Sequence, residues 1–160
     1  MKGEDNIKIL QEMPIFKELS TEEIRNILEY INEEKYYGGE IIFEENDSGD
    51  KLYIIKSGGV KIIKIIEEDK EKTLAIFSKG ILFGEMAILD NSVRSATAKA
   101  IEDTQVFTIT RENFEKLIEK NPLTAIKILK GLVRILSQRL RTTNEQISDL
   151  VMWGLSKGKT

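Results

Sequence analysis

The chain has 160 residues, 41% of them hydrophobic and 32% charged, with a formal net charge of −3. This length suits one domain that buries a core of its own. The chain contains neither Cys nor His, which excludes disulfides, Cys-ligated zinc, iron–sulfur clusters, thiol nucleophiles and the usual general base. We therefore expect no metal site. An enzyme is the least expected class, although catalysis by Asp, Glu, Lys or Ser stays open in principle.

No stretch approaches the roughly 20 apolar residues that a membrane-spanning helix needs. The first five residues, Met-Lys-Gly-Glu-Asp, lack the apolar core of a signal peptide. We expect a cytoplasmic protein without membrane contact. Acidic and basic residues are interspersed, which gives no support to a surface dedicated to nucleic acid, so direct DNA binding is not expected.

Two helices are predicted near the N-terminus. The first covers about 7–13 and stops at Pro14. The second runs from about Thr21 to Glu34, because apolar residues recur there at helical spacing. Ser20 is suited to cap this helix, and Glu23 three residues later completes a capping box.

The middle of the chain has the pattern of short strands separated by turns. Turn-forming clusters occur at 46–50, 57–59 and 67–71, and we expect the last of these to be a hairpin tip. Many short strands at this spacing predict a sandwich, jelly roll or barrel-like roll. The β-branched and aromatic runs that predict strands lie at 41–43, 51–56, 60–66, 72–78, 95–101 and 105–110.

Helical periodicity returns after Thr110, which is suited to cap a helix carrying Phe114 and Leu117. Pro122 opens another helix, which we expect to reach about residue 153. Its most regular feature is an a/d heptad seam at alternating steps of three and four residues. The seam consists of Ile126, Leu129, Val133, Leu136, Leu140, Thr143, Ile147 and Leu150.

Two interpretations of this seam are open: the core-facing stripe of a single helix, or the interface of a parallel homodimer. A second apolar stripe of Ile128, Leu132 and Ile135 favours the homodimer, because one stripe can pack on the roll while the other meets a partner helix. At 1.5 Å per residue the helix would be roughly 45–48 Å long, too long to lie wholly against a small roll. We therefore expect a homodimer.

Residues 80–101 carry the chemistry of a ligand site. Gly84 lets backbone approach a ligand closely, and the N–H groups that open a short helix over 85–89 favour an anion. Arg94 offers a planar fork for phosphate oxygens, and Ser95 adds a hydroxyl donor. Glu85 would oppose an anion but could accept a hydrogen bond from a sugar hydroxyl. Taken singly, each of three residues has a simpler explanation. Gly84 could form a turn, Arg94 could be a surface side chain, and Glu85 could favour the N-terminus of its helix electrostatically.

Together, 84–89 (GEMAIL) and 94–97 (RSAT) closely resemble the phosphate-binding cassette of the cyclic-nucleotide-binding domain family. That family includes catabolite activator proteins, protein kinase A regulatory subunits and cyclic-nucleotide-gated channels. The segment 39–61 is similar to the family's first roll motif. The resemblance implies an α+β, mainly β fold: a double-stranded β-helix (a jelly-roll-like β-roll) with N-terminal helices and a long C-terminal dimerisation helix. Expected domains are 1–121 and 122–160.

The resemblance also implies the ligand, cAMP first and cGMP as an open alternative. Arg94 and Ser95 would hold the cyclic phosphate, and Glu85 would accept the ribose 2′-hydroxyl. Backbone N–H groups near Gly84 and Ala87 would complete the cradle. The expected ligand-binding residues are Phe83, Gly84, Glu85, Met86, Ala87, Arg94, Ser95, Ala96, Thr143 and Asn144.

Thr143 and Asn144 are included because 138–145 resembles the dimer helix of the bacterial activators, in which a Thr-Ser pair contacts adenine. Thr143 is the one polar residue of the seam, so it either specifies register or contacts the base. Asn144 stands where the Ser would be, which leaves base preference open. Five basic residues of the helix are assigned to a solvated face: Lys127, Lys130, Arg134, Arg139 and Arg141.

The expected function is a non-enzymatic sensor that couples cassette occupancy to the C-terminal helix. One alternative is the sensor part of a transcription regulator truncated before its helix-turn-helix domain. Another is a dimerisation module that binds a different anionic ligand or none. Retention of Glu85 and Arg94 argues against an empty pocket, because a buried unpaired Arg is costly without its anion.

Overall fold

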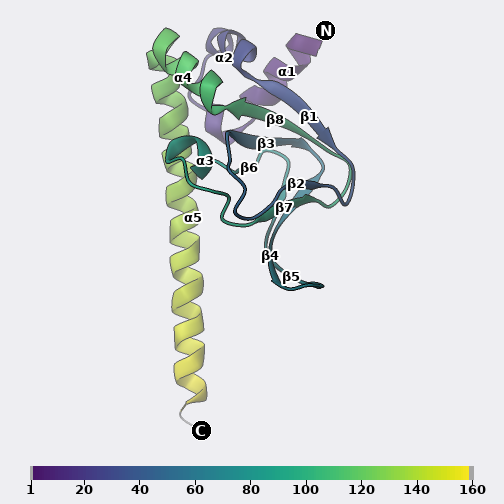
Figure 1. Cartoon of the computed structure of the whole chain (residues 1–160). Helices are drawn as coiled ribbons and strands as arrows, with labels where there is room; N and C mark the ends of the chain where they lie inside the picture. Colours follow the sequence, from purple (N-terminus) through teal and green to yellow (C-terminus); the bar gives the residue numbers. More distant parts are fainter. Residues whose placement is uncertain (1, 159–160) are drawn as a thin grey trace.

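The computed structural model describes residues 2–158 as a β-roll with helices at one end and a long helix along one side (Figure 1). The N-terminal helical elements are α1 (Lys2–Gln11), η1 (Pro14–Phe16), α2 (Thr21–Ile27) and η2 (Leu28–Tyr30). The C-terminal ones are α4 (Arg111–Lys120) and α5 (Pro122–Lys157). A single short helix, α3 (Met86–Leu89), interrupts the strands.

The capping box at the start of α2 is confirmed. The Ser20 hydroxyl accepts from the amide of Glu23 at 3.2 Å, and the Glu23 carboxylate accepts from the amide of Ser20 at 2.8 Å. The predicted extent of this helix, to Glu34, is wrong. The helix ends at Ile27, and residues 32–36 are a strand that pairs over five residues with the strand β8 (Thr104–Thr110). Pairing with a distant strand supplies the backbone hydrogen bonds that a longer helix would have made.

The strands of residues 2–158 form two four-stranded antiparallel sheets that face one another across the roll. The strand orders are β1-β8-β3-β6 and β2-β7-β4-β5. Their bounds are β1 Asn32–Tyr36, β2 Ile41–Phe43, β3 Lys51–Ser57, β4 Gly59–Glu67, β5 Lys70–Ser78, β6 Leu82–Phe83, β7 Thr97–Ala100 and β8 Thr104–Thr110. The six predicted strands and the 67–71 hairpin tip are confirmed, whereas β1 was not predicted.

Two clusters of buried apolar side chains hold this arrangement together. The smaller one lies inside the roll and includes Tyr53, Val60, Phe83 and Val106. The larger one joins the roll to its helices, with residues from α1, η1, α2, β3, β8, α4 and α5. Burial of this apolar surface is the main stabilising contribution.

The first half of α5 packs tightly on the N-terminal elements. Ile128 and Leu132, from the second predicted stripe, are buried in the larger cluster. At Gly131 the helix passes so close to η1 that an added Cβ would lie 2.4 Å from the carbonyl oxygen of Ile15. This close contact holds the first half of α5 against η1.

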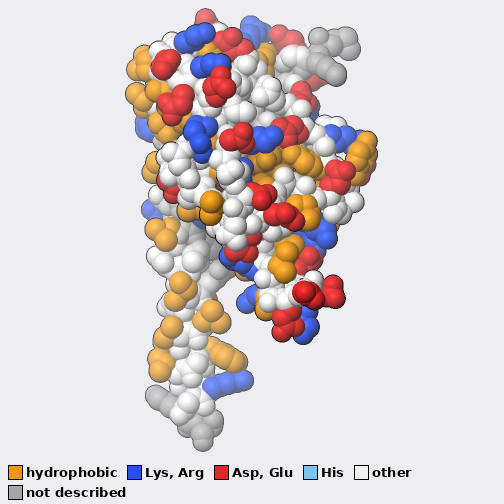
Figure 2. Space-filling view, viewed as in Figure 1, with side chains coloured by type: hydrophobic (Ala, Val, Ile, Leu, Met, Phe, Trp, Pro, Cys, Tyr) orange, Lys and Arg blue, Asp and Glu red, His pale blue; other side chains and the backbone are white. Residues whose placement is uncertain are grey.

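The second half of α5 extends beyond the roll, as Figure 1 shows. Its 36 residues span about 54 Å at 1.5 Å per residue. Of the seam residues, Leu129 and Leu136 pack partly against the core, whereas Leu140 is 61% and Leu150 68% exposed. Figure 2 shows hydrophobic side chains on this projecting part. The seam residues with half or more of their surface exposed are Ile126, Val133, Leu140, Ile147 and Leu150.

Candidate functional site

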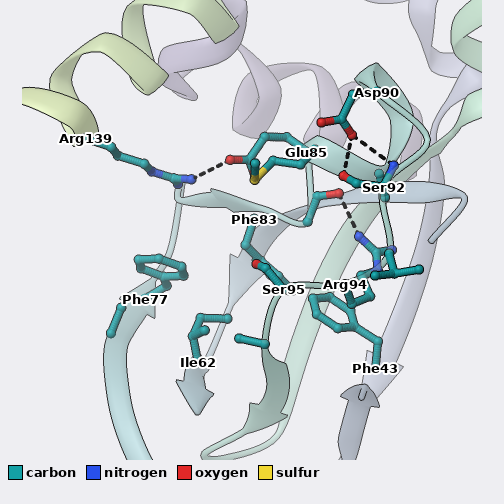
Figure 3. A pocket seen from close by; sticks show the side chains of 16 residues that line it. Phe43, Ile62, Phe77, Phe83, Glu85, Asp90, Ser92, Arg94, Ser95 and Arg139 are labelled. Atoms are coloured by element: carbon teal, nitrogen blue, oxygen red, sulfur yellow. Dashed lines mark hydrogen bonds and ion pairs between the residues drawn. The ribbon is translucent and has the colours of Figure 1, made fainter. Parts of the chain in front are cut away.

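A pocket of about 380 Å³ lies between the roll and α5. This volume is within the range of small-molecule sites, roughly 300–1,000 Å³. Five parts of the chain meet there: β2, the β4–β5 hairpin, β6 with the start of α3, the 90–96 loop, and α5. In the view of Figure 3, Arg139 and Arg94 lie on opposite sides of the pocket, with Glu85 and Phe83 between them.

Arg94 is 5% exposed, and the described chain gives it no carboxylate partner within ion-pair distance. Its Nη1 donates to the carbonyl of Gly84 at 2.7 Å and its Nη2 to the carbonyl of Lys51 at 2.8 Å. Nε is buried with no hydrogen-bond partner. The guanidinium carbon lies 4.2 Å from the ring centre of Phe43. A guanidinium has five N–H donors, so these two bonds leave three for a ligand.

Burial disfavours the charged form of Arg94 and lowers the pKa of its guanidinium below the ordinary value. Tyr53, Asp50 and, less strongly, Asp47 act in the opposite direction. Arginine keeps its proton across the physiological range, so the pocket holds a fixed positive charge. A desolvated positive charge that has no carboxylate within ion-pair distance is suited to bind an anion.

Gly84 and α3 bring backbone close to Arg94. Gly84 has φ 72°, and an added Cβ would lie 2.7 Å from Arg94 Nη1, so both the backbone conformation and the space require glycine. The chain then turns into α3, with Glu85 as its N-cap residue. Gly49 is equally confined, because its Cβ would lie 2.4 Å from Ala87 Cβ and 2.6 Å from Arg94 Nε.

Glu85 is the acidic residue on the other side of the pocket. It is 6% exposed and forms an ion pair with Arg139 of α5, with 3.2 Å between Oε1 and Nη1 (Figure 3). Arg139 also donates to the carbonyl of Leu82, and its guanidinium carbon lies 5.2 Å from the ring centre of Phe77. The ion pair satisfies a carboxylate that would be costly to bury alone.

The remaining wall of the pocket is apolar. Ile62 of β4 and Ala75 and Phe77 of β5 line it, together with Phe83. Tyr53 and Phe83 stack below with ring centres 5.0 Å apart and planes 10° apart. An aromatic and aliphatic wall beside a cationic site suits a flat ring that carries an anionic group.

Eight of the ten predicted ligand-binding residues line this pocket: Phe83, Gly84, Glu85, Met86, Ala87, Arg94, Ser95 and Ala96. Thr143 and Asn144 do not line it. Both are exposed on α5, where the Thr143 hydroxyl donates to the carbonyl of Arg139 at 2.9 Å. They lie about one helical turn further along α5 than Arg139, which does line the pocket.

Several lining residues were not predicted, of which Arg139 is the most informative. It was assigned to a solvated helix face, and that assignment is wrong, because its side chain pairs with Glu85. Arg139 lies one turn before Thr143 on α5, and this spacing could have indicated that Arg139 faces the same pocket. The other unpredicted lining residues are Phe43, Ile62, Ala75, Phe77, Asp90, Ser92 and Val93.

Residues 2–158 lack a membrane-spanning helix and a metal-binding cluster. No helix in that range is both long and apolar enough to cross a membrane. The same residues contain no group of three or more carboxylate or other metal-ligating side chains that could hold a metal ion.

The sequence and the fold of this chain are similar to those of known proteins. The family model described as "Cyclic nucleotide-binding domain" matches residues 33–121, which include the β-roll and the cassette. The cyclic AMP receptor protein of Thermus thermophilus is 37% identical over 134 residues, which are 84% of this chain and 60% of that protein. The chain therefore spans about 60% of the length of this relative.

Two further relatives show how widely the fold is shared. The cGMP-dependent protein kinase egl-4 of Caenorhabditis briggsae is 36% identical over 114 residues, 70% of this chain and 15% of the kinase. A cyclic nucleotide-binding domain from Methylobacillus flagellatus superposes with a TM-score of 0.80 at 28% identity, covering 91% of this chain and 82% of that one. The match to the family model over the roll, together with these relatives, shows that the chain belongs to the cyclic nucleotide-binding domain family.

Proposed function

We propose that this chain is a non-enzymatic sensor domain whose pocket binds a cyclic nucleotide, cAMP or cGMP, and couples its occupancy to α5. The observation that carries the proposal is Arg94, a buried guanidinium with an unpartnered Nε and no carboxylate partner among residues 2–158. A buried charge is costly unless an opposite charge compensates it. An anionic ligand supplies that compensation.

The phosphate of the ligand would occupy the Arg94 side of the pocket. Arg94 would offer its free N–H donors, and Ser95 its hydroxyl, to the phosphate oxygens. Backbone amides near Gly84 and Ala87 would complete the cradle, because Gly84 keeps side-chain atoms out of this space.

The ribose would lie beside Glu85, whose carboxylate can accept a hydrogen bond from the 2′-hydroxyl. Glu85 can do this while it keeps its ion pair, because a carboxylate has about four acceptor positions. Arg139 would then close the same side of the pocket. This arrangement places α5 in contact with the group that recognises the sugar.

The base would pack against the apolar wall of Ile62, Ala75 and Phe77. These three side chains have no hydrogen-bonding groups. They can therefore provide apolar contact area for the base but cannot discriminate between adenine and guanine. We assign that choice to Thr143 and Asn144, which would contact the base from α5 of this copy or of a second copy.

A parallel homodimer through α5 is part of this proposal. The exposed seam residues between Ile126 and Leu150 support it, because leaving five large apolar side chains in water is unfavourable. In this account 1–121 is the ligand-binding unit and 122–160 the dimer and output helix. A ligand can shift α5 from one position to another only to the extent that it binds the protein more tightly when α5 is in the second position.

Calorimetric titration with cAMP, cGMP and linear 5′-AMP tests the proposal. We expect micromolar or tighter binding of at least one cyclic nucleotide and at least tenfold weaker binding of 5′-AMP, whose dianionic phosphate is not tethered to the 3′-oxygen. No binding of either cyclic nucleotide by folded protein that is free of carried-over ligand would contradict the proposal and favour a different anion.

A further inference from the structure

Arg111, the first residue of α4, joins the cassette to the C-terminal helices. Its Nη2 donates to the carbonyl of Gly49 at 2.8 Å and also to the carbonyl of Ala87 in α3. Its own amide donates to the carbonyl of Asp50 at 2.6 Å. One residue thus connects three segments: the β2–β3 loop, the cassette helix and the start of α4.

The placement of Arg111 is not explained by the stability of α4. A cation at a helix N-terminus faces the positive end of the helix dipole, which is unfavourable. Arg111 forms no ion pair with a carboxylate of residues 2–158, and its Nε is buried without a partner. A neutral or acidic residue would suit this position better, so the cost points to a function for its contacts.

The two carbonyls that Arg111 holds belong to the backbone that surrounds Arg94. Gly49 lies against both Ala87 and Arg94, so closely that an added Cβ would overlap with each. A change in the position of Arg94 or of α3 therefore has to move the same backbone that Arg111 holds. Steric confinement of this kind transmits small shifts, because packed interiors are not freely deformable.

Arg111 is also connected to the C-terminal helices, because it is the first residue of α4 and α4 packs against α5. Phe114 and Leu117 of α4 are buried in the same apolar cluster as Ala125, Ile128 and Leu132 of α5. A shift at the first residue of α4 is therefore passed to α5 through packed side chains.

We propose that Arg111 is a positioning residue that transmits occupancy of the Arg94 site to α4 and α5. This inference rests on the proposed sensor function and names the residue through which the sensor acts. An anion that draws α3 toward Arg94 moves the Ala87 carbonyl, and the bond from Arg111 makes the start of α4 follow. Arg111 itself does not touch the ligand.

Arg111→Met tests the inference, because it removes the donors and keeps an unbranched apolar side chain. Lys116→Met, on the exposed side of the same helix, is the matched control. Hydrogen exchange is measured for residues 86–90, 111–120 and 124–135. In the free protein, Arg111→Met should speed exchange in 86–90 roughly tenfold, as expected for the loss of a charged hydrogen bond. The control should leave these rates unchanged.

Coupling is then measured with two perturbations of the cassette. One is saturating cyclic nucleotide, and the other is Gly84→Ala, which forces a Cβ onto Arg94 without any ligand. In the Lys116→Met background both should change exchange in 111–120 and 124–135, as in the wild type. In the Arg111→Met background these changes should be lost, while nucleotide affinity stays within about threefold of wild type. Arg111→Lys, which keeps one cationic donor, should restore part of the response.

A full helix response in Arg111→Met to either perturbation overturns the inference, as do unchanged exchange rates in 86–90. If the wild type binds neither nucleotide, the proposed function fails, and the Gly84→Ala comparison still decides whether Arg111 couples the two regions.

Discussion

Arg139 of α5 and Glu85 of the cassette form an ion pair with 3.2 Å between Nη1 and Oε1. The Glu85 side chain is 8% exposed, whereas the Arg139 side chain is 32% exposed, so the pair lies at the boundary between the pocket and solvent. The carboxylate proposed to recognise the sugar is therefore the same group that holds α5 to the cassette. Ligand recognition and helix position share one residue.

The first prediction concerns Glu85 and the 2′-hydroxyl. Wild-type protein should bind cAMP roughly 10–100-fold more tightly than 2′-deoxy-cAMP, the range expected for one hydrogen bond to a charged acceptor. Glu85→Ala should bind the two compounds within about threefold of each other, because it has no acceptor for that hydroxyl. Calorimetry measures all four affinities. If Glu85→Ala still prefers cAMP as strongly as the wild type does, another group recognises the sugar.

The second prediction concerns the backbone at Gly84. Gly84→Ala should lower the free energy of unfolding by about 1–2 kcal/mol, since a left-handed conformation costs a Cβ-bearing residue this much. It should also weaken nucleotide binding at least tenfold, because the new Cβ overlaps with Arg94. Gly154→Ala is the control, since nothing lies within 4 Å of its added Cβ and α5 is helical there. Equal nucleotide affinity for wild type and Gly84→Ala would contradict the assigned cradle.

The third prediction concerns the seam of α5. Leu140→Glu should convert a dimer to a monomer in sedimentation equilibrium without unfolding it, because Leu140 is 61% exposed in the single chain. Gln138→Glu adds the same charge to an exposed position off the seam and should leave the dimer intact. A wild-type protein that sediments as a monomer, or a Leu140→Glu variant that stays dimeric, would refute the proposed interface.

The fourth prediction is a pH dependence at Glu23. Hydrogen bonds from Lys127 and from the amide of Ser20 hold the pKa of Glu23 below its ordinary value of 4.5. A carboxyl with a lowered folded-state pKa stabilises the fold above its unfolded pKa and loses that contribution as pH falls through the folded value. Glu23→Gln should therefore lower the free energy of unfolding by roughly 0.5–1 kcal/mol at pH 7, a modest value because Lys127 is partly exposed.

The loss caused by Glu23→Gln should shrink as pH falls below about 4.5, because the wild-type carboxyl then becomes neutral as well. Urea unfolding at several pH values measures it. Glu22→Gln, on the exposed face of the same first turn, is the control. A loss that is constant between pH 7 and pH 3 would show that the charge of Glu23 is not its cause.

The features predicted correctly from sequence are those whose signal is local. The capping box of Ser20 and Glu23 spans four residues, and the stripes of α5 repeat within each heptad. The cassette is likewise a short contiguous segment, so eight of its lining residues between Phe83 and Ala96 could be named in advance.

The features missed depend on partners far away in the chain. Strand β1 has a charged sequence, and its structure comes from pairing with β8 more than 65 residues later. Arg139 resembles any solvated basic residue until its partner, 54 residues earlier, is known. Sequence periodicity carries no information on such contacts, because the fold creates them.

Calorimetric titration of wild type and Arg94→Lys with cAMP and cGMP tests most directly whether Arg94 binds the phosphate of a cyclic nucleotide. Arg25→Lys, at an exposed ion pair with Glu4, is the matched control, and thermal melting verifies that each variant is folded. We predict that Arg94→Lys weakens binding roughly 100-fold or more, because lysine keeps the charge but loses the guanidinium fork that makes several charged hydrogen bonds, while Arg25→Lys binds as the wild type does. Equal affinity of Arg94→Lys and wild type would show that Arg94 does not bind the phosphate.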